Sequence, residues 1–158
     1  MSALLAAQAA LDAGVHGGDP TRFRSPDIDE YLDNVHMPPG LPWCSAFVFH
    51  CFAEAAFQLD VPNPCPCTAS ALHLFQNAPS AAHVALPAPG DVFVLVHPDG
   101  IHGHCGFVES CSPGGDVITT IEGDTNAAGS STGDAVGRHV EWTPADGKRG
   151  RLLGYLAL

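Results

Sequence analysis

The spacing of the apolar residues changes near Pro89, and this change constrains the fold more than any other feature of the chain. Before Pro89 the apolar residues recur every three or four positions, as on one face of a helix, and after it they alternate, as in a strand. Helices followed by antiparallel strands are typical of the α+β class. The sequence therefore predicts an α+β fold, with N-terminal helices packed on a C-terminal antiparallel sheet.

Four helices are expected in the first half of the chain. One covers residues 2–13, and a second follows Ser25, whose hydroxyl suits a helix N-cap ahead of a proline. The longest covers residues 43–59, where apolar side chains form a continuous seam. The fourth is expected to begin at a cap formed by Thr68.

Five strands are expected in the second half, separated by turns rich in glycine, proline and aspartate. They cover residues 91–96, 104–110, 117–122, 138–142 and 152–158. No internal repeat or linker interrupts the 158 residues, a length typical of one domain. We therefore expect a single domain over residues 1–158.

The charge balance excludes two classes of function. Six Lys and Arg against seventeen Asp and Glu give a net charge of −11, so no basic face for nucleic acid or for an anionic membrane surface can form. No apolar run approaches the ~18 residues of a membrane span. Residues 1–12 are apolar, but no Lys or Arg precedes Arg22, so we interpret them as a helix rather than an export signal and expect synthesis in the cytoplasm.

Cys44 is the most informative single residue. Pro42 precedes it, as is common at a helix start, so Cys44 is expected in the first turn of the helix over residues 43–59. The unpaired amides and the dipole at a helix start lower the pKa of a thiol, and the thiolate is the form that attacks a carbonyl. Cys44 also lies on the apolar seam of this helix, so a buried structural cysteine is the alternative.

His104 is the candidate general base. It begins a predicted strand between Gly103 and Gly106, where the missing side chains allow another segment to approach closely. Cys105 is expected on the opposite face of that strand, because side chains alternate. A structural or exposed histidine is the alternative, and His102, which has the same parity, competes for the role.

Two acids follow at the end of the next predicted strand. If residues 104–110 and 117–122 form a hairpin, Glu122 lies beside His104, where a group that fixes the imidazole tautomer belongs. Asp124 competes for the same role, and a solvated carboxylate at a strand end is the alternative. A second acid near the ring would raise the pKa of the imidazolium and favour a thiolate–imidazolium pair.

Four segments follow one another in a characteristic order. They read LPWCSAFV over residues 41–48, PGDVFV over 89–94, GHCGFV over 103–108 and IEGDTN over 121–126. In this pattern the chain resembles the CHAP domains of the NlpC/P60-like superfamily. The resemblance covers residues 27–142 and implies a papain-like fold and a cysteine amidase or endopeptidase of peptidoglycan. It implies Cys44 as nucleophile, His104 as base and Glu122 as orienting residue.

The chain departs from the family pattern at one position. Many CHAP domains have an asparagine where this chain has Asp124, and a carboxylate cannot donate a hydrogen bond as an amide does. Either Glu122 or Asp124 is therefore a candidate to orient His104. Two further residues are candidates for contacts with substrate: Trp43, expected to wall the cleft, and Asn126, which begins a polar loop that is either a cleft rim or a plain turn.

Two groups of residues resemble metal sites but have structural explanations. Cys65 and Cys67 have no second pair at zinc-finger spacing. Asp27, Asp29 and Asp33 lack the glycine-bearing loop of a calcium site, and the helix dipole explains them better. We expect no metal and no cofactor, and we expect most of the six cysteines to be reduced.

These observations predict a cysteine hydrolase that cleaves an amide bond in the stem peptide of bacterial peptidoglycan or at its junction with the glycan. The expected setting is a phage lysis enzyme or an antibacterial effector that reaches the cell wall by a specialised route. An effector would have a cognate inhibitor, or immunity, protein as partner. The alternatives are a thiol acyltransferase or protease acting on proteins, a non-catalytic binding module on the same fold, and a redox or metal protein that uses Cys65 and Cys67.

Overall fold

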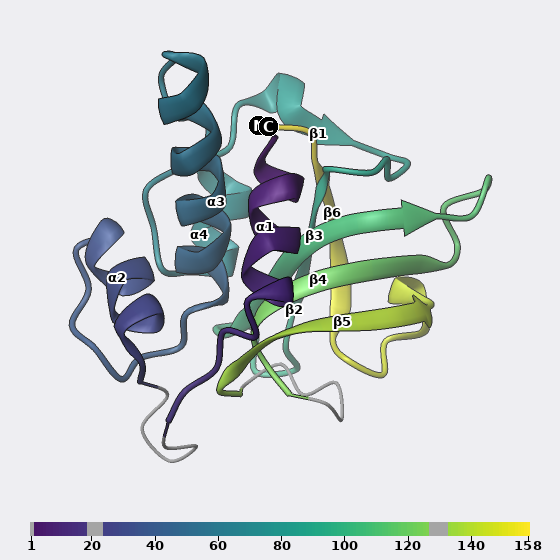
Figure 1. The fold of residues 1–158 in the computed structure, drawn as a ribbon. Helices are drawn as coiled ribbons and strands as arrows, with labels where there is room; N and C mark the ends of the chain where they lie inside the picture. Colours follow the sequence, from purple (N-terminus) through teal and green to yellow (C-terminus); the bar gives the residue numbers. More distant parts are fainter. Residues whose placement is uncertain (1, 19–23, 127–132) are drawn as a thin grey trace.

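The computed structural model describes residues 2–18, 24–126 and 133–158, and it shows a layer of helices against a twisted sheet (Figure 1). The strands all pair antiparallel, in the order β1-β6-β2-β3-β4-β5. Their bounds are β1 His83–Val84, β2 Val92–Val96, β3 Gly103–Cys111, β4 Ile118–Thr125, β5 Ala135–Trp142 and β6 Arg151–Leu156. The predicted α+β class is confirmed, with the helices preceding the sheet in the chain.

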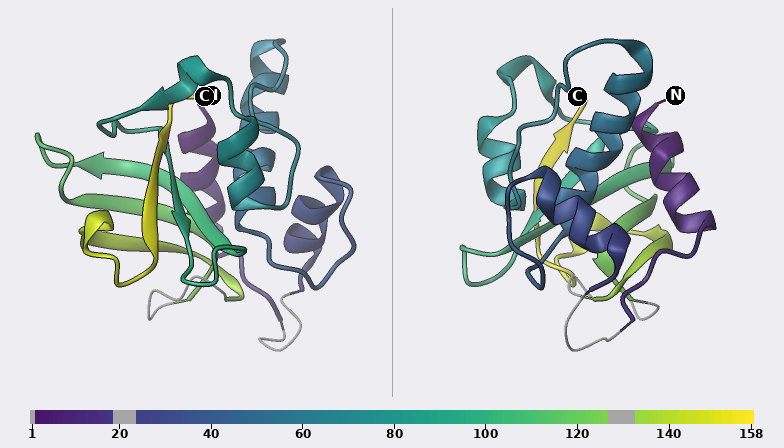
Figure 2. Two further views of the ribbon diagram at one scale, coloured as in Figure 1. Left: turned by 180° about the vertical axis from the view of Figure 1, so that it is seen from behind. Right: turned by 60° about the vertical axis from the view of Figure 1, so that its left-hand side comes forward.

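The helices lie on one side of the sheet (Figure 2). Three of them contact strands directly, and the helix over residues 26–34 packs on the longest one instead. None of the helices in the described residues is long and apolar enough to cross a bilayer. The bounds are α1 Ala3–Asp12, α2 Pro26–Asn34, α3 Cys44–Leu59 and α4 Ala71–Asn77, with short 3-10 helices at Ser80–Ala82 and Pro144–Asp146.

One of the two predicted helix caps is confirmed and the other is wrong. The hydroxyl of Ser25 accepts a hydrogen bond from the Ile28 amide at 3.2 Å and caps α2. The fourth helix begins after Ser70, not Thr68: the Ser70 hydroxyl accepts from the amide of the third helical residue. The Thr68 hydroxyl accepts from the Ser70 amide at 3.1 Å, so it stabilises the turn that leads into the cap.

The predicted strands are all present, with shifted bounds. The expected hairpin is confirmed, since β3 and β4 pair antiparallel with Phe107 opposite Ile121. Strand β4 continues past Glu122 to Thr125, which pairs with Ala135, so β5 begins three residues before the predicted start at residue 138. The two-residue strand β1 was not predicted, because pairing with the sheet edge rather than an apolar pattern defines it.

Helix α3 packs at the centre of the molecule. The rings of Phe47 and Phe52 lie 6.3 and 5.6 Å from the ring of Phe107 on β3. Gly123 on β4 faces α3 at a point with no room for a side chain, because a Cβ atom there would lie 2.7 Å from Cβ of Phe47. This close approach sets the first turn of α3 against the ends of β3 and β4.

Candidate active site

Cys44 is the first residue of α3, as its position after Pro42 predicted. The N-cap, Trp43, makes no side-chain capping bond, so no capping side chain occupies the first-turn amides, which are suited to bind an anion. The hydroxyl of Ser45 donates to the carbonyl of Thr68 at 2.8 Å and ties this turn to the neighbouring loop. This contact helps to position the first turn of α3, which carries Cys44.

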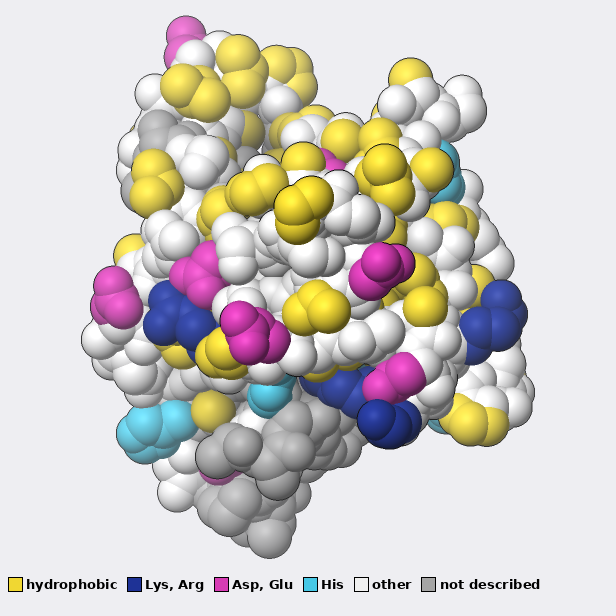
Figure 3. All heavy atoms as spheres, turned by 90° about the vertical axis from the view of Figure 1, so that its right-hand side faces the viewer, with side chains coloured by type: hydrophobic (Ala, Val, Ile, Leu, Met, Phe, Trp, Pro, Cys, Tyr) yellow, Lys and Arg dark blue, Asp and Glu magenta, His cyan; other side chains and the backbone are white. Residues whose placement is uncertain are grey.

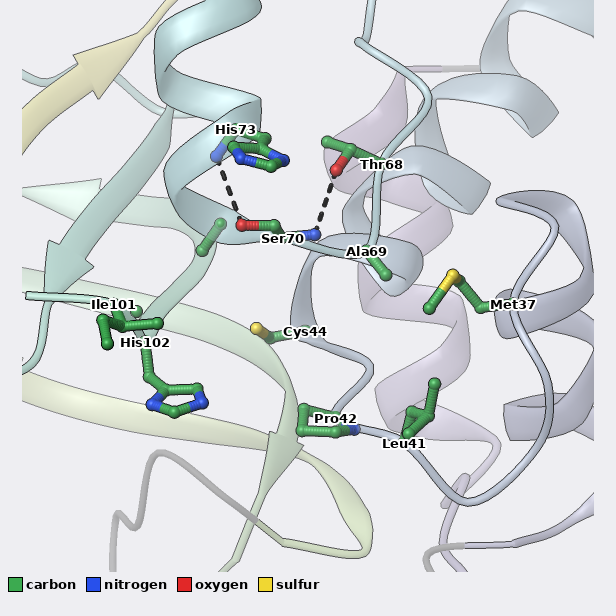
Figure 4. Close-up of a pocket in the computed structure, with 12 residues that line it drawn as sticks. Met37, Leu41, Pro42, Cys44, Thr68, Ala69, Ser70, His73, Ile101 and His102 are labelled. Atoms are coloured by element: carbon green, nitrogen blue, oxygen red, sulfur yellow. Dashed lines mark hydrogen bonds between the residues drawn. The ribbon is translucent and has the colours of Figure 1, made fainter.

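Cys44 lies at the wall of a cavity of about 400 Å³. The side chain is only 3% exposed, and its sulfur points into the space between Ser70 and Ile101 (Figure 4). The remaining lining comes from the loop before α3, from the segment that leads into α4 and the first turn of that helix, and from the turn that leads into β3; it consists of Met37, Leu41, Pro42, Thr68, Ala69, Ala71, His73, His102 and Gly103. None of the described residues that line this cavity is Lys, Arg, Asp or Glu, so it suits an uncharged part of a ligand.

His104 on β3 is fully buried and lies between Cys44 and Glu122. Its Nε2 atom is 2.8 Å from Oε2 of Glu122, whereas Nδ1 makes no hydrogen bond of ordinary geometry with the described residues. The ring still interacts with the Cys44 side chain strongly enough for each to shift the pKa of the other. The contact between the ring and the sulfur is thus looser than an ordinary hydrogen bond.

The competing histidine is placed differently. His102 is exposed at the rim of the same cavity, and its Nδ1 atom lies 2.6 Å from Oδ2 of Asp99. Its partner is therefore a surface carboxylate in the turn, while His104 has a buried one. Of the two, only His104 interacts with both Cys44 and a buried acid.

The surroundings favour a thiolate at Cys44 and a protonated ring at His104. A hydrogen bond with the thiol of Cys105 lowers the pKa of Cys44 well below its usual range, and the His104 ring adds to this effect against burial, which raises it. Burial lowers the pKa of His104, but the interactions with Cys44 and Glu122 outweigh it and raise the pKa to about 10. A thiolate–imidazolium pair at neutral pH follows.

Glu122 is a fully buried carboxylate with three hydrogen-bonding partners. It accepts hydrogen bonds from the Thr120 hydroxyl and from both terminal nitrogens of Arg149, in addition to the contact with His104. Burial raises the pKa of Glu122, but Arg149 and His104 lower it well below the usual range. Glu122 is therefore ionised, and its charge requires Nε2 of His104 to carry a proton, so Nδ1 is the nitrogen that faces Cys44.

Asp124 does not contact His104 through a hydrogen bond. Its Oδ2 accepts from the Trp43 amide at 3.2 Å and its Oδ1 from the Gly133 amide at 3.1 Å, and its φ of 58° is in the left-handed region. Burial and the nearby Cys44 charge raise the pKa of Asp124 to about 8. Asp124 therefore binds the backbone that leads into α3, whereas Glu122 binds the imidazole of His104.

The expectation that Trp43 walls the cleft is wrong. Its side chain is fully buried, its indole nitrogen donates to the Gly133 carbonyl at 3.3 Å, and its ring packs against Tyr31 and Phe47. Trp43, the N-cap of α3, therefore faces the core and not the cavity. Asn126 is half-buried at the end of a described segment, and its role in substrate contact stays a prediction; residues 127–132 of the polar loop lie outside the described residues.

Arg149 is the functional residue that sequence reasoning missed. It lies in the turn before β6, forms the ion pair with Glu122, and its guanidinium stacks 4.6 Å from the centre of the Trp142 ring. A buried ionised acid needs a counter-charge, and a chain with six Lys and Arg offers few candidates. The sequence indicates that a counter-charge for the buried acid is needed. To identify Arg149 as that counter-charge, one must also know that β6, which follows Arg149, pairs with β2.

The remaining candidate metal ligands do not come together. No group of three or more His, Cys, Asp or Glu side chains within the described part of the chain could hold a metal ion. Cys65 is buried and Cys67 is exposed, and Asp29 pairs with Arg24 instead of with neighbouring acids. All six cysteines are free thiols.

Comparison with known proteins agrees with this arrangement. The family model for the CHAP domain, a cysteine- and histidine-dependent amidohydrolase or peptidase domain of peptidoglycan hydrolases, matches residues 36–124. No curated protein and no solved structure matches the chain. The match spans more than half of the sequence and includes the helix start with Cys44, the strand with His104 and the strand with Glu122 and Asp124. The chain therefore belongs to the CHAP family.

Proposed function

We propose that this protein hydrolyses an amide bond of peptidoglycan, with Cys44 as nucleophile, His104 as general base and acid, and Glu122 as the residue that orients His104. One observation carries the proposal: the buried ring of His104 joins an ionised carboxylate on one side and a cavity-lining sulfur on the other. The CHAP family acts on peptidoglycan, which supports the choice of substrate.

The first half of the reaction forms an acyl-enzyme. The thiolate of Cys44, whose proton is on Nδ1 of His104, attacks the carbonyl carbon of the amide and forms the carbon–sulfur bond. The negative charge on the carbonyl oxygen is held by the first-turn amides of α3. His104 then donates its proton to the leaving nitrogen, the carbon–nitrogen bond breaks, and the amine departs.

The second half regenerates the enzyme. His104, now neutral, takes a proton from water, and the resulting hydroxide attacks the thioester carbon. The carbon–sulfur bond breaks, the acid product leaves, and the thiolate–imidazolium pair is restored. Glu122 keeps one tautomer of the ring through both halves, and Asp124 holds the backbone at Trp43 so that the sulfur stays in place.

The biological setting belongs to the same proposal. Peptidoglycan-directed chemistry supports a phage lysis enzyme and an antibacterial effector alike, and both act on the bacterial cell wall. For an effector, we infer a small immunity protein that occludes the cavity at Cys44 in the producing cell. Affinity purification of the Cys44→Ala variant from producer cells should then recover one stoichiometric partner; its absence would favour the lysis enzyme.

The central experiment is digestion of purified sacculi and defined muropeptides with mass analysis of the fragments. The wild-type protein should release two hydrolysed ends at one amide bond, and Cys44→Ala should abolish release while Cys67→Ala, which removes an exposed thiol, retains it. A new amide in the products would indicate acyl transfer instead. Full activity of Cys44→Ala would overturn the proposal.

A second experiment separates the enzyme from a non-catalytic module on the same fold. An activated Cys44 should react with iodoacetamide at a rate that stays high down to about pH 6, because the thiolate persists there. Peptide mapping identifies the modified cysteine, and His104→Ala should slow the reaction at that pH. A Cys44 that reacts only above about pH 8, as an ordinary thiol does, would exclude the nucleophile we propose.

A further inference from the structure

Arg151 differs from the other cations that the structure describes. Arg151, the first residue of β6, is exposed and has no carboxylate partner among the described residues. On the face shown in Figure 3, Lys and Arg side chains are few and most lie beside Asp or Glu. The described ion pairs with Lys or Arg are Arg24–Asp29, Arg138–Glu109, Lys148–Asp146 and Arg149–Glu122. Among the Lys and Arg side chains that the structure describes, Arg151 is thus the exception, and its guanidinium is available to an external anion.

Arg151 lines a second cavity of about 630 Å³, which shares no lining residue with the cavity at Cys44. His97 also lines it, and the Nε2 atom of this histidine is buried without a hydrogen-bond partner among the described residues. The rest of the lining is apolar or glycine backbone. A volume of this size accommodates a short peptide segment.

No acidic side chain of the described residues lines this cavity, although the chain contains seventeen Asp and Glu. The two acids nearest to it in the sequence have other partners: Asp99 contacts His102, and Asp146 contacts Lys148. A guanidinium without an acidic partner at the wall of such a cavity favours the binding of an anionic group.

The two cavities lie on either side of one short turn. The turn covers residues 97–102 between β2 and β3; His97 and Gly100 line the second cavity, while Ile101 and His102 line the one at Cys44. The His97 amide donates to the His102 carbonyl at 2.9 Å, and the side chain of Asp99 accepts from two amides of the same turn. These hydrogen bonds stabilise the turn, which separates the cavity at Cys44 from the cavity at Arg151.

We propose that the second cavity binds a carboxylate of the peptide substrate while the scissile amide lies at Cys44 on the other side of the turn. The guanidinium of Arg151 is the partner of that carboxylate, since its planar donors match two carboxylate oxygens. This inference rests on the proposed function and narrows it to peptides that carry a free carboxylate away from the cleaved bond. A peptide with the same carboxyl group amidated is the poorer substrate.

The test compares two peptides that differ only in this group. For the wild-type protein, kcat/KM for a stem-peptide fragment with a free terminal carboxylate should exceed that for its carboxamide by about fivefold, as expected for one partly exposed charge-assisted contact. Arg151→Gln should bring this ratio to about one, mainly through KM. Arg138→Gln, which breaks an ion pair elsewhere, should leave the ratio unchanged. A ratio that survives Arg151→Gln would overturn the inference.

A binding measurement separates this inference from the proposed function. Calorimetry of the Cys44→Ala protein with the same two peptides measures recognition without cleavage. Preference for the carboxylate that disappears in the Cys44→Ala, Arg151→Gln double variant supports the cavity even if the wild-type protein cleaves neither peptide. Equal binding of both peptides, together with normal cleavage, rejects the cavity and leaves the proposed function intact.

Discussion

Glu122 and Asp124 lie two residues apart on β4, and both are buried, yet their surroundings favour opposite charge states. Burial raises the pKa of each carboxyl. At Glu122, the guanidinium of Arg149 and the ring of His104 reverse this effect and keep the group ionised. At Asp124, the partners are two backbone amides, which only partly oppose burial, and the pKa rises to about 8. The partner that the fold supplies, rather than the depth of burial, decides the state of each acid.

The backbone explains how neighbours in sequence reach such different partners. The pairing of β4 with β5 shifts between Glu122 and Thr125, and Asp124 has a positive φ. Glu122 therefore faces Arg149 and His104 on the side of the sheet away from α3, while Asp124 turns toward the start of α3. One irregular stretch of strand thus serves both the imidazole and the helix that carries the sulfur.

The largest effect is expected from Glu122→Gln, which removes the charge and keeps the shape. Without the carboxylate, His104 loses its tautomer control, and kcat/KM should fall at least about a hundredfold. Arg149, whose side chain is only 16% exposed, would lose its counter-ion, at a cost of about 3 kcal/mol in the free energy of unfolding. Muropeptide digestion and urea unfolding measure the two effects. Activity near that of the wild type would remove Glu122 from the mechanism.

The next effect is expected from Arg149→Gln, which leaves Glu122 in place without its counter-charge. The folded-state pKa of Glu122 is depressed, so the stability that this group contributes is present above its unfolded pKa, about 4.3, and is lost as the pH falls through the folded value. In the variant the folded pKa rises, and the acid limb of the pH–activity profile should move to higher pH. Unfolding should become easier by about 3 kcal/mol at pH 7.

The matched control for that variant is Arg138→Gln, because Arg138 also pairs with a glutamate but on the surface. It should leave the acid limb in place and change stability by less than about 1 kcal/mol. An acid limb that moves equally in both variants would show that net charge, and not the contact with Glu122, controls the profile.

Asp124→Asn tests the other side of the comparison with a smaller effect. The folded-state pKa of Asp124 is raised to about 8. The folded protein therefore binds more protons than the unfolded chain between about pH 4 and pH 8, and this group lowers stability as the pH rises across that range. In Asp124→Asn this decline should flatten. Urea unfolding at several pH values measures it, and an unchanged slope would mean that Asp124 is already ionised at low pH.

The smallest effect is expected from Trp142→Phe. The variant keeps an aromatic ring beside Arg149 but removes the indole donor that lies 3.1 Å from the Thr120 hydroxyl, which in turn donates to Glu122. A loss of about 1 kcal/mol in unfolding free energy is expected, with activity reduced no more than about threefold. A larger fall in activity would mean that the hydrogen bond from Trp142 to Thr120 contributes more to positioning Glu122 than the ion pair with Arg149 does.

The sequence sufficed where a local pattern reports directly on structure. The change of apolar period near Pro89 predicted the order of helices and strands, and a proline ahead of Cys44 predicted the helix start that carries the sulfur. Strand parity placed Cys105 and His104 on opposite faces, and the structure agrees, with Cys105 in the core cluster beside α3. The expectation of one domain over residues 1–158 and the catalytic roles of the site residues stay predictions.

The sequence failed where the outcome depends on contacts across the fold. Trp43 is next to the nucleophile in the chain, but the direction of its ring is set by Tyr31 and Phe47, and it points into the core. Arg149 is 27 residues from Glu122, and no spacing rule links them. Whether Glu122 or Asp124 binds His104 depends on the shift in strand pairing between Glu122 and Thr125, which no residue pattern predicts.

The close packing of helix α3 on strands β3 and β4 also bears on how the site is held together. The sulfur belongs to the helical layer and the imidazole to the sheet, so the reacting groups are joined only through the packing that Gly123 permits. A wedge as small as one methyl group at that glycine would separate the layers. The activity that we propose therefore depends on the fit between the two layers, and we expect it to be lost under mild heating or denaturant before the secondary structure melts.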